Sequence, residues 1–167
     1  GKELEESKKR ADEALAELAK LKKELEAVKG DKQKQVEYKS AANVLSAKDW
    51  FEKADELYRS GDKQGTIDAY SRAIELDPKY ATTYYNRGIA YAISDDLKRA
   101  IIDFDRAIEL DPKYTTAYYA RGIAYYNLGD KIRAIVDFDK AIELDPKYAP
   151  PYYNRGIAYA ISDDLKR

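Results

Sequence analysis

A fixed repeat of 34 residues constrains the fold of this chain more than any other feature of its sequence. Residues 81–114 and residues 115–148 form two successive blocks of this length, and they align without a gap. A period of this size is typical of stacked supersecondary units that bury their apolar faces against neighbouring copies. The sequence therefore predicts an array of short helical units in place of a single globular core.

Each block contains two amphipathic segments separated by a turn. In the third block, residues 115–148, the first segment has recurring residues at three- and four-residue spacings, namely Tyr118, Gly122, Tyr125 and Tyr126. Gly129 and Asp130 interrupt the pattern, and aspartate is a typical N-cap for a second helix. The second segment carries small and large residues on one face, namely Ala134, Phe138, Ala141 and Leu144. Pro146 then ends the helix, because proline disfavours helical backbone in the residue before it.

This order of large and small side chains resembles the tetratricopeptide repeat family. In that family the first helix carries large, small and large residues, the second carries small, large and small ones, and a proline follows. In the second block these residues are Tyr84, Gly88, Tyr91, Ala100, Phe104, Ala107 and Pro112, and in the first block they include Trp50, Ala54, Leu57, Tyr70, Ala73 and Pro78. The resemblance covers residues 47–167. It implies an all-α, right-handed α-solenoid of helix-turn-helix repeats at 47–80, 81–114, 115–148 and, incompletely, 149–167.

Residues 1–29 differ in composition from the repeats and show a heptad pattern. Its two rows are Leu4, Ala11, Leu18 and Leu25, and, three residues later, Ser7, Ala14, Leu21 and Val28. Such a seam is typical of a coiled coil, but alanine and serine make the apolar stripe narrow. Three arrangements therefore remain open: self-association through the seam, packing of the helix on its own repeats, and a mostly free helix.

Residues 30–46 are interpreted as a helical connector or an N-terminal cap. Ser46 followed by Asp49 resembles a capping box, which predicts that the first repeat begins here.

The fourth block, residues 149–167, repeats residues 81–99 with two differences, at positions 150 and 151. Both positions hold proline, which the first turn of a helix tolerates. The block contains a first helix and no second helix, so the face formed by Tyr152, Gly156 and Tyr159 has no partner within this sequence. Either the chain is a fragment of a longer array, or another chain covers this face, or helix 150–162 serves as an imperfect end cap. We favour a fragment, with an intermolecular contact at this end as a consequence.

Composition argues against several classes of function. The chain has no cysteine and no histidine, which excludes disulfides, thiol chemistry and the commonest general base and zinc ligand. Its 30 basic and 31 acidic residues are intermixed, unlike the residues of a nucleic-acid-binding surface. No apolar run approaches the roughly 20 residues that span a bilayer, and no signal peptide is visible, which favours a cytoplasmic location. The chain begins with glycine and has no methionine, so we expect that the native N-terminus is missing.

Acidic residues recur in pairs along the array. The pairs are Asp95 with Asp96, Asp103 with Asp105, Asp137 with Asp139, and Asp163 with Asp164. Acidic pairs can bind metals or transfer protons, but residues two apart on a helix do not face each other. The pairs also recur with the repeat, whereas an active site is usually singular. We interpret them as solvated charges and helix caps, which predicts a non-enzymatic protein without metal or cofactor.

The resemblance implies that the first helices of the repeats line a concave groove that holds a peptide. The residues at the family's groove positions are Phe51, Tyr85, Asn86, Ile89, Tyr119, Ile123, Tyr126, Asn127, Tyr153, Asn154 and Ile157. Chaperone-binding members grip a C-terminal carboxylate with Lys, Asn and Arg at such positions, and only Asn86 and Asn154 fit that pattern. A groove of Tyr and Ile favours an apolar or amphipathic segment. The alternative is that these side chains mainly pack against neighbouring first helices.

Three arginines stand where the family usually has an apolar residue, and they are Arg87, Arg121 and Arg155. Their aliphatic stems can cover the core while the guanidinium groups reach solvent, Asp103 or Asp137. We therefore expect a structural role for them.

The main functional hypothesis is a non-enzymatic adaptor that binds a protein, as a peptide or a partner helix, and neither nucleic acid nor a membrane. The alternative is a self-assembling scaffold, a homo-oligomer joined through the N-terminal helix and the uncapped C-terminal helix. The residues that would make these self-association contacts are Leu4, Ala11, Leu18, Leu21, Leu25, Val28, Tyr152 and Tyr159.

Overall fold

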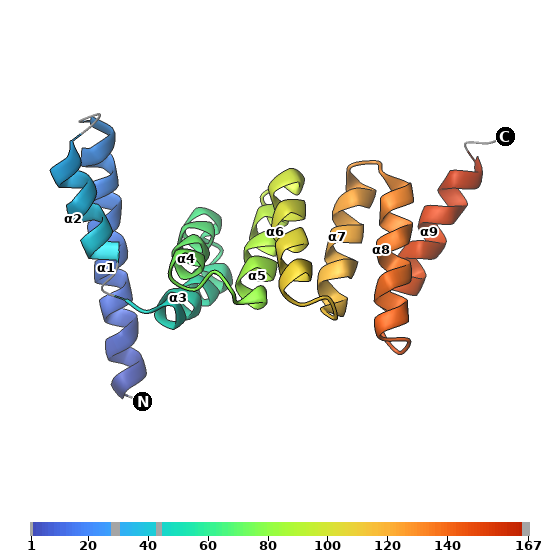
Figure 1. The fold of residues 1–167 in the computed structure, drawn as a ribbon, viewed down its shortest axis with the longest axis horizontal. Helices are drawn as coiled ribbons and strands as arrows, with labels where there is room; N and C mark the ends of the chain where they lie inside the picture. The colour runs from blue at the N-terminus through green and yellow to red at the C-terminus, as the bar shows by residue number, and fades with distance from the viewer. Residues whose placement is uncertain (1, 28–30, 43–44, 165–167) are drawn as a thin grey trace. The chain divides into compact units, whose positions relative to one another are not determined.

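The computed structural model describes residues 2–27, 31–42 and 45–164, and this part of the chain contains helices and turns without strands. Two helices, α1 (Lys2–Ala27) and α2 (Lys32–Ala42), precede the repeats. The repeat helices are α3 (Ala47–Ser60), α4 (Lys63–Leu76), α5 (Ala81–Ile93), α6 (Leu97–Leu110), α7 (Thr115–Asn127), α8 (Lys131–Leu144) and α9 (Pro150–Asp164) (Figure 1). The predicted all-α fold of helix-turn-helix repeats is confirmed.

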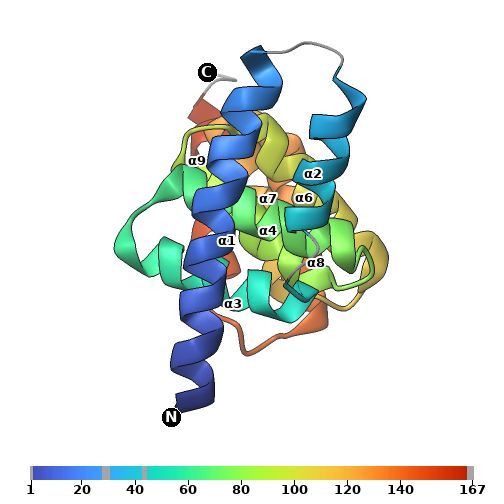
Figure 2. The same cartoon turned by 90° about the vertical axis from the view of Figure 1, so that its left-hand side faces the viewer.

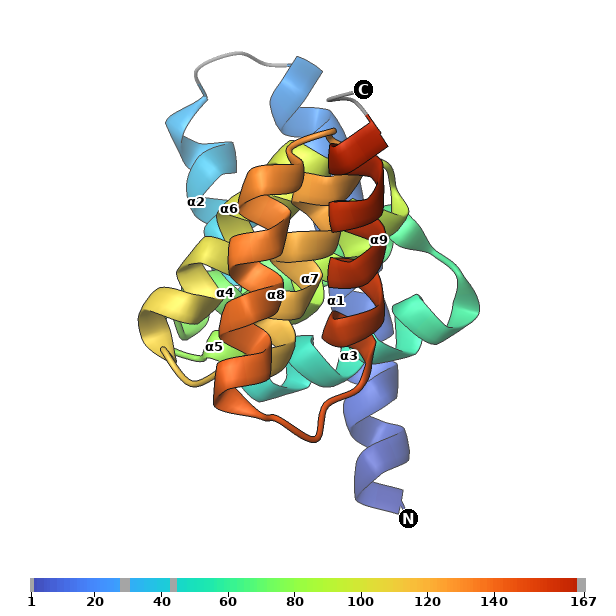
Figure 3. The same ribbon diagram turned by 90° about the vertical axis from the view of Figure 1, so that its right-hand side faces the viewer.

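The helices fall into two compact units, Gly1–Pro78 and Lys79–Arg167. In the second unit, α5 packs against α6, and α7 packs against α8. Successive pairs meet because α6 packs against α7 and α8 packs against α9. Figure 3 shows α8 beside α9, with α7 next to both. This unit therefore contains two complete helix pairs and the first helix of a third.

The same turn joins the two helices of each pair. The N-caps of the second helices are Asp62, Asp96 and Asp130, and each carboxylate accepts a hydrogen bond from the backbone N–H three residues later. The residue before each cap has a positive φ, 84° in Gly61, 63° in Asp95 and 83° in Gly129. Glycine suits two of these positions because it adopts left-handed backbone without a Cβ clash. The predicted cap at Asp130 is confirmed.

In the second unit, the core depends on an aromatic ring lying directly against the backbone of the first helix. Phe104 and Phe138 are fully buried. A Cβ atom on Gly88 would lie 2.6 Å from Cε1 of Phe104, and one on Gly122 would lie 2.7 Å from Cε1 of Phe138. Only a residue without a side chain allows this approach. The small residues of the first helix and the large residues of the second therefore set how closely the two helices pack.

The first unit is built around the single tryptophan. Trp50 of α3 is buried together with Ala54 of the same helix and with residues of α4, namely Ala69, Tyr70 and Ala73. The capping box predicted at the start of α3 is confirmed: the Ser46 hydroxyl accepts from the Asp49 N–H at 3.2 Å, and the Asp49 carboxylate accepts from the Ser46 N–H at 3.0 Å.

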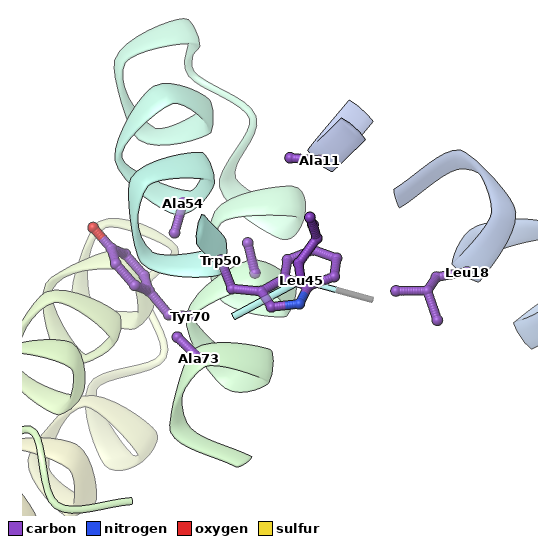
Figure 4. Packing of buried hydrophobic residues seen from close by; sticks show 8 residues of the cluster. Ala11, Leu18, Leu45, Trp50, Ala54, Tyr70 and Ala73 are labelled. Atoms are coloured by element: carbon purple, nitrogen blue, oxygen red, sulfur yellow. The ribbon is translucent and has the colours of Figure 1, made fainter. Parts of the chain in front are cut away.

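Helix α1 packs within the first unit, against α2 and α3 (Figure 2). Ala11 and Leu18 of the heptad seam belong to the same buried cluster as Trp50, and Leu21 is also buried (Figure 4). Ala14 of the seam is partly buried against this cluster. The side chains of the remaining seam residues lie outside the described residues, and these are Leu4, Ser7, Leu25 and Val28. The central part of the seam is thus covered by helices of its own chain.

Candidate protein-interaction face of the second unit

The first helices of the second unit, α5, α7 and α9, carry ten of the predicted groove residues. Helix α7 lies between the other two and contacts both of them. The ten residues are Tyr85, Asn86 and Ile89 of α5, Tyr119, Ile123, Tyr126 and Asn127 of α7, and Tyr153, Asn154 and Ile157 of α9. We call this set of residues the α5–α7–α9 face.

Two tyrosines of this face sit in aromatic clusters. The ring centroid of Tyr85 lies 5.0 Å from that of Tyr114 and 5.9 Å from that of Phe104. Tyr119 repeats the arrangement with Tyr148 at 5.5 Å and Phe138 at 6.0 Å. Both Tyr85 and Tyr119 are half-buried, so each ring is held by packing on one side while part of it stays accessible.

The tyrosines that follow the second helices were not among the predicted site residues. Tyr114 and Tyr148 follow α6 and α8, and they extend the aromatic clusters beside the first helices. Burial raises the pKa of the Tyr114 hydroxyl, and burial likewise raises the pKa of Tyr148. The sequence signal for them is the repeated Asp-Pro-Lys-Tyr at the end of each block, in which the proline predicts the helix end and the tyrosine recurs with the same period.

The two asparagines of the face are in different environments. The Asn154 amide donates to the Tyr119 hydroxyl at 2.8 Å and to the carbonyl of Pro150 at 3.2 Å. This bond ties α9 to α7. Within the part of the chain that the structure describes, the Asn86 side chain makes no hydrogen bond, and Asn86 is half-buried on α5. Asn86 therefore keeps both its donor and its acceptor for another molecule.

The other members of the face range from half-buried to exposed. Ile89, Ile123, Ile157 and Tyr126 are half-buried, whereas Asn127 is exposed. Tyr153 is the most accessible aromatic residue of the face, with 73% of its surface exposed.

Phe51, the remaining predicted groove residue, belongs to the first unit. Its ring packs edge-on against Tyr70 at 5.6 Å, and it lies against the Trp50 cluster. The contacts described for Phe51 are thus with residues of its own unit.

The arginines of the first helices are directed into the repeats. Arg87 donates two hydrogen bonds to Asp103, both of 2.7 Å. Arg121 donates to both carboxylate oxygens of Asp137 at 2.8 and 2.6 Å, and to Asp105 of the preceding repeat at 2.6 Å. The expectation that these guanidinium groups reach the carboxylates of the second helix is confirmed.

The interpretation of the acidic pairs as solvated charges is wrong for Asp103 and Asp137. Both carboxylates are only 4% exposed, because the arginine of the first helix covers them. Burial raises the pKa of Asp137, and the hydrogen bonds from Arg121 oppose that shift. Burial alone would lower the pKa of Arg121, but its bonds to Asp137 and Asp105 outweigh burial and raise that pKa. Each cation is thus neutralised inside the repeat.

Arg155 of α9 makes a different ion pair. Its guanidinium donates to Asp139 of the preceding repeat at 2.5 Å, as Arg121 does to Asp105. This pair is more open, since the Asp139 side chain is 48% exposed.

The chemistry that the face offers is therefore that of neutral rings, aliphatic branches and amides. Within the described residues there is no group of three or more His, Cys, Asp or Glu side chains that could hold a metal ion. Within the same residues, no helix is long and apolar enough to cross a membrane. Half-buried tyrosines beside isoleucines are suited to contact with another protein segment.

Comparison with known families identifies the repeats. The family described as "TPR repeat" matches residues 54–93, and the family described as "Tetratricopeptide repeat" matches residues 81–114, 115–148 and 138–167. The chain belongs to the tetratricopeptide repeat family. A comparison with the curated proteins finds no match.

Solved structures with a similar fold include domains bound to peptides. The first tetratricopeptide domain of Spaghetti (RPAP3), bound to the HSP90 peptide SRMEEVD, is 26% identical with a TM-score of 0.68, over 73% of this chain and 94% of that one. The second such domain of human RPAP3, in complex with the HSP70 peptide SGPTIEEVD, is 28% identical with a TM-score of 0.63, over 68% and 92%. The domain of Arabidopsis OM64 is 27% identical with a TM-score of 0.65, over 67% and 93%. The repeats of this chain are thus those of a protein-interaction module.

Proposed function

We propose that the α5–α7–α9 face binds an apolar or amphipathic segment of a partner protein, as an extended peptide or a helix. The observation that carries the proposal is that Tyr85 and Tyr119 are held half-buried by aromatic neighbours while one side stays accessible. Rigid aromatic residues lose little side-chain entropy on binding, which makes them efficient contacts. The protein acts as an adaptor and not as an enzyme.

The charge on this face argues against a partner that ends in an acidic tail. The peptides in the two RPAP3 complexes end in Glu-Glu-Val-Asp. Two cations of the helices that carry the face, Arg87 and Arg121, are engaged by buried aspartates. The amide of Asn154 is engaged by Tyr119, whereas Asn86 and the exposed Asn127 can offer amides to a peptide backbone. An apolar segment loses nothing by meeting such a surface, whereas a free carboxylate would lose hydration without a cation to replace it.

A peptide-array experiment tests the proposal. An array of heptapeptides that vary in hydrophobicity, with SRMEEVD included as the acidic probe, would be incubated with the full chain. We expect apolar and amphipathic peptides to bind more tightly than SRMEEVD. The tightest apolar peptide, measured by fluorescence anisotropy, should lose roughly tenfold or more in affinity for Tyr119→Ala, as expected for an aromatic anchor.

The matched control is Tyr118→Ala in the same helix. The Tyr118 ring lies under the Arg121 guanidinium, 5.5 Å from its carbon, and Tyr118 is not one of the residues of the α5–α7–α9 face. This variant should bind the peptide like the unchanged chain. Undiminished affinity in Tyr119→Ala, or SRMEEVD as the tightest ligand, would contradict the proposal.

A second candidate function is end-to-end assembly through α9. Tyr152 and Tyr159 of this helix are exposed, and among the described residues no atom beyond the neighbouring helix backbone lies within 4 Å of the place where a Cβ would stand on Gly156. Sedimentation of a Tyr152→Ser, Tyr159→Ser double variant tests this candidate. Assembly through α9 predicts that the variant is smaller in solution than the unchanged chain at equal concentration.

A further inference from the structure

The first repeat differs from the later ones in how it could neutralise a buried cation. By the 34-residue period, Lys53 of α3 corresponds to Arg121 of α7, and Ala69 of α4 corresponds to Asp137 of α8. The second helix, which supplies the buried carboxylate in the later repeat, therefore offers only a methyl group here. The cation at position 53 must therefore be neutralised by carboxylates other than the one the later repeats use.

Helix α1 supplies one of these carboxylates. The Lys53 side chain is only 5% exposed, and its ammonium group forms ion pairs with Asp12 of α1 and, at 3.3 Å, with Glu56 one turn later in α3. Burial alone would lower the pKa of Lys53, but these two partners outweigh burial and raise that pKa. Removing one partner of a buried pair is costly because the remaining charge is left without compensation. Lys53 therefore favours the docked position of α1.

The residues of α1 that surround this ion pair are also its heptad residues. Ala11 and Leu18 occupy equivalent places seven residues apart, and both are buried in the Trp50 cluster. In a coiled coil these two places face the partner helix. A given α1 helix cannot present Ala11 and Leu18 to Trp50 and to another α1 at the same time. Docking of α1 and pairing of α1 are thus mutually exclusive.

A second copy of α1 fits this seam better than an arbitrary helix does. If Leu4 begins the heptad at position a, Glu17 stands at position g and Lys22 at the next position e. Across a parallel pair of helices, g and e residues of opposite charge attract each other. Asp12 stands at position b, which faces away from the seam. The ion pair with Lys53 therefore acts on docking and not on the contact between copies.

We propose that α1 is an exchangeable strap. When α1 is docked, its seam covers Trp50 of its own chain, and when α1 is released, the same seam pairs with α1 of a second copy. The Asp12–Lys53 ion pair sets the balance, because the apparent affinity between copies falls with the fraction of chains whose α1 is docked. This device is independent of peptide binding by the second unit.

Charge reversal of Asp12 in the full chain tests the proposal. Asp12→Lys places a cation against the buried Lys53, so we expect the dissociation constant of the dimer, measured by sedimentation, to fall about tenfold or more. Trp50 is the only tryptophan and is fully buried, so its fluorescence should shift to longer wavelength in the same variant. The matched control is Glu13→Lys, which changes the charge equally at a side chain that is 66% exposed. It should behave like the unchanged chain.

A double-variant cycle separates release of the strap from a general charge effect. Lys53→Met removes the buried cation, so Asp12→Lys should change dimerisation much less in that background. An equal effect of Asp12→Lys in both backgrounds would overturn the proposal. A Glu13→Lys variant that dimerises as strongly as Asp12→Lys would overturn it too.

A cross-link provides an independent test that leaves the Asp12–Lys53 ion pair unchanged. The chain has no cysteine, so Ala11→Cys introduces a single thiol at the centre of the seam. Oxidation should give a disulfide-linked dimer in which the Trp50 emission is shifted to longer wavelength, and reduction should reverse the shift. A cross-linked dimer with unchanged Trp50 emission would show that docking and pairing of α1 coexist, and it would refute the proposal.

Discussion

Adding one methyl group to Gly122 tests whether the small positions of the repeat set the distance between its helices. The chain provides its own control, because residues 121–125 and 155–159 have the same sequence, Arg-Gly-Ile-Ala-Tyr, in α7 and α9. A Cβ on Gly122 would lie 2.7 Å from Cε1 of Phe138, whereas a Cβ on Gly156 would meet no atom within 4 Å in the described residues beyond its own helix backbone. The two substitutions thus share their local sequence and differ in what the new methyl group meets.

The magnitude follows from two opposing terms. Alanine is favoured over glycine inside a helix by about 1 kcal/mol, so Gly156→Ala should stabilise α9 by up to about that amount. Gly122→Ala gains the same term, but it overpacks a core in which Phe138 is fully buried, at a cost of about 1–3 kcal/mol. With a central value of about 2 kcal/mol for overpacking, Gly122→Ala should destabilise the second unit by about 1 kcal/mol. The two variants should then differ by roughly 2 kcal/mol.

The assay is urea unfolding followed by circular dichroism, together with amide hydrogen exchange. Exchange should slow in α9 for Gly156→Ala and accelerate in α7 and α8 for Gly122→Ala. Trp50 fluorescence, which reports the first unit, serves as an internal reference. Equal stabilisation by the two substitutions would refute the reasoning, because it would mean that Phe138 moves aside freely and that the glycine does not set the helix spacing.

Two other predictions concern charge. Arg121→Met strands the carboxylate of Asp137 in the core and should cost about 3 kcal/mol of unfolding free energy, whereas the control Arg155→Met breaks a more open pair and should cost less than about 1 kcal/mol. Equal losses in urea unfolding would contradict this explanation. The backbone N–H of residue 133 lowers the pKa of the Asp130 cap, so this cap stabilises the fold above the unfolded pKa of about 3.9 and the effect is lost as the pH falls through the lower folded pKa. In thermal unfolding between pH 7 and pH 2.5, the unchanged chain should therefore have a higher melting temperature than Asp130→Asn. This difference in melting temperature should shrink below about pH 4.

The elements of the repeats were predictable because their signals are local. An aspartate before a helix caps it wherever the helix lies, and Asp130 does so here. The pairing of small with large residues was also predictable from the period. Every complete block has a small residue at the position of Gly122 and an aromatic residue at the position of Phe138. Such features need only the neighbouring turn or the neighbouring helix.

The surroundings of the candidate site were less predictable because they depend on contacts between elements. Asp137 looks solvated by the rules of helix spacing, yet Arg121, sixteen residues earlier, covers it completely. Tyr148 belongs to a loop by sequence, yet its ring contacts Tyr119 of the preceding helix pair. In both cases the partner is set by how two helices pack, which a periodicity on either helix alone does not report.

The residues of the first repeat that differ from the later repeats bear on whether α1 packs against its own chain. A heptad seam has the same apolar spacing whether it meets a second copy or its own chain, so the pattern in residues 1–29 does not choose between them. The repeats do contain that information. Lys53 keeps the cation of the later repeats, and Ala69 lacks their carboxylate. Since a buried ammonium group requires an anion, the carboxylate that Ala69 does not supply is replaced by those of Glu56 in α3 and Asp12 in α1.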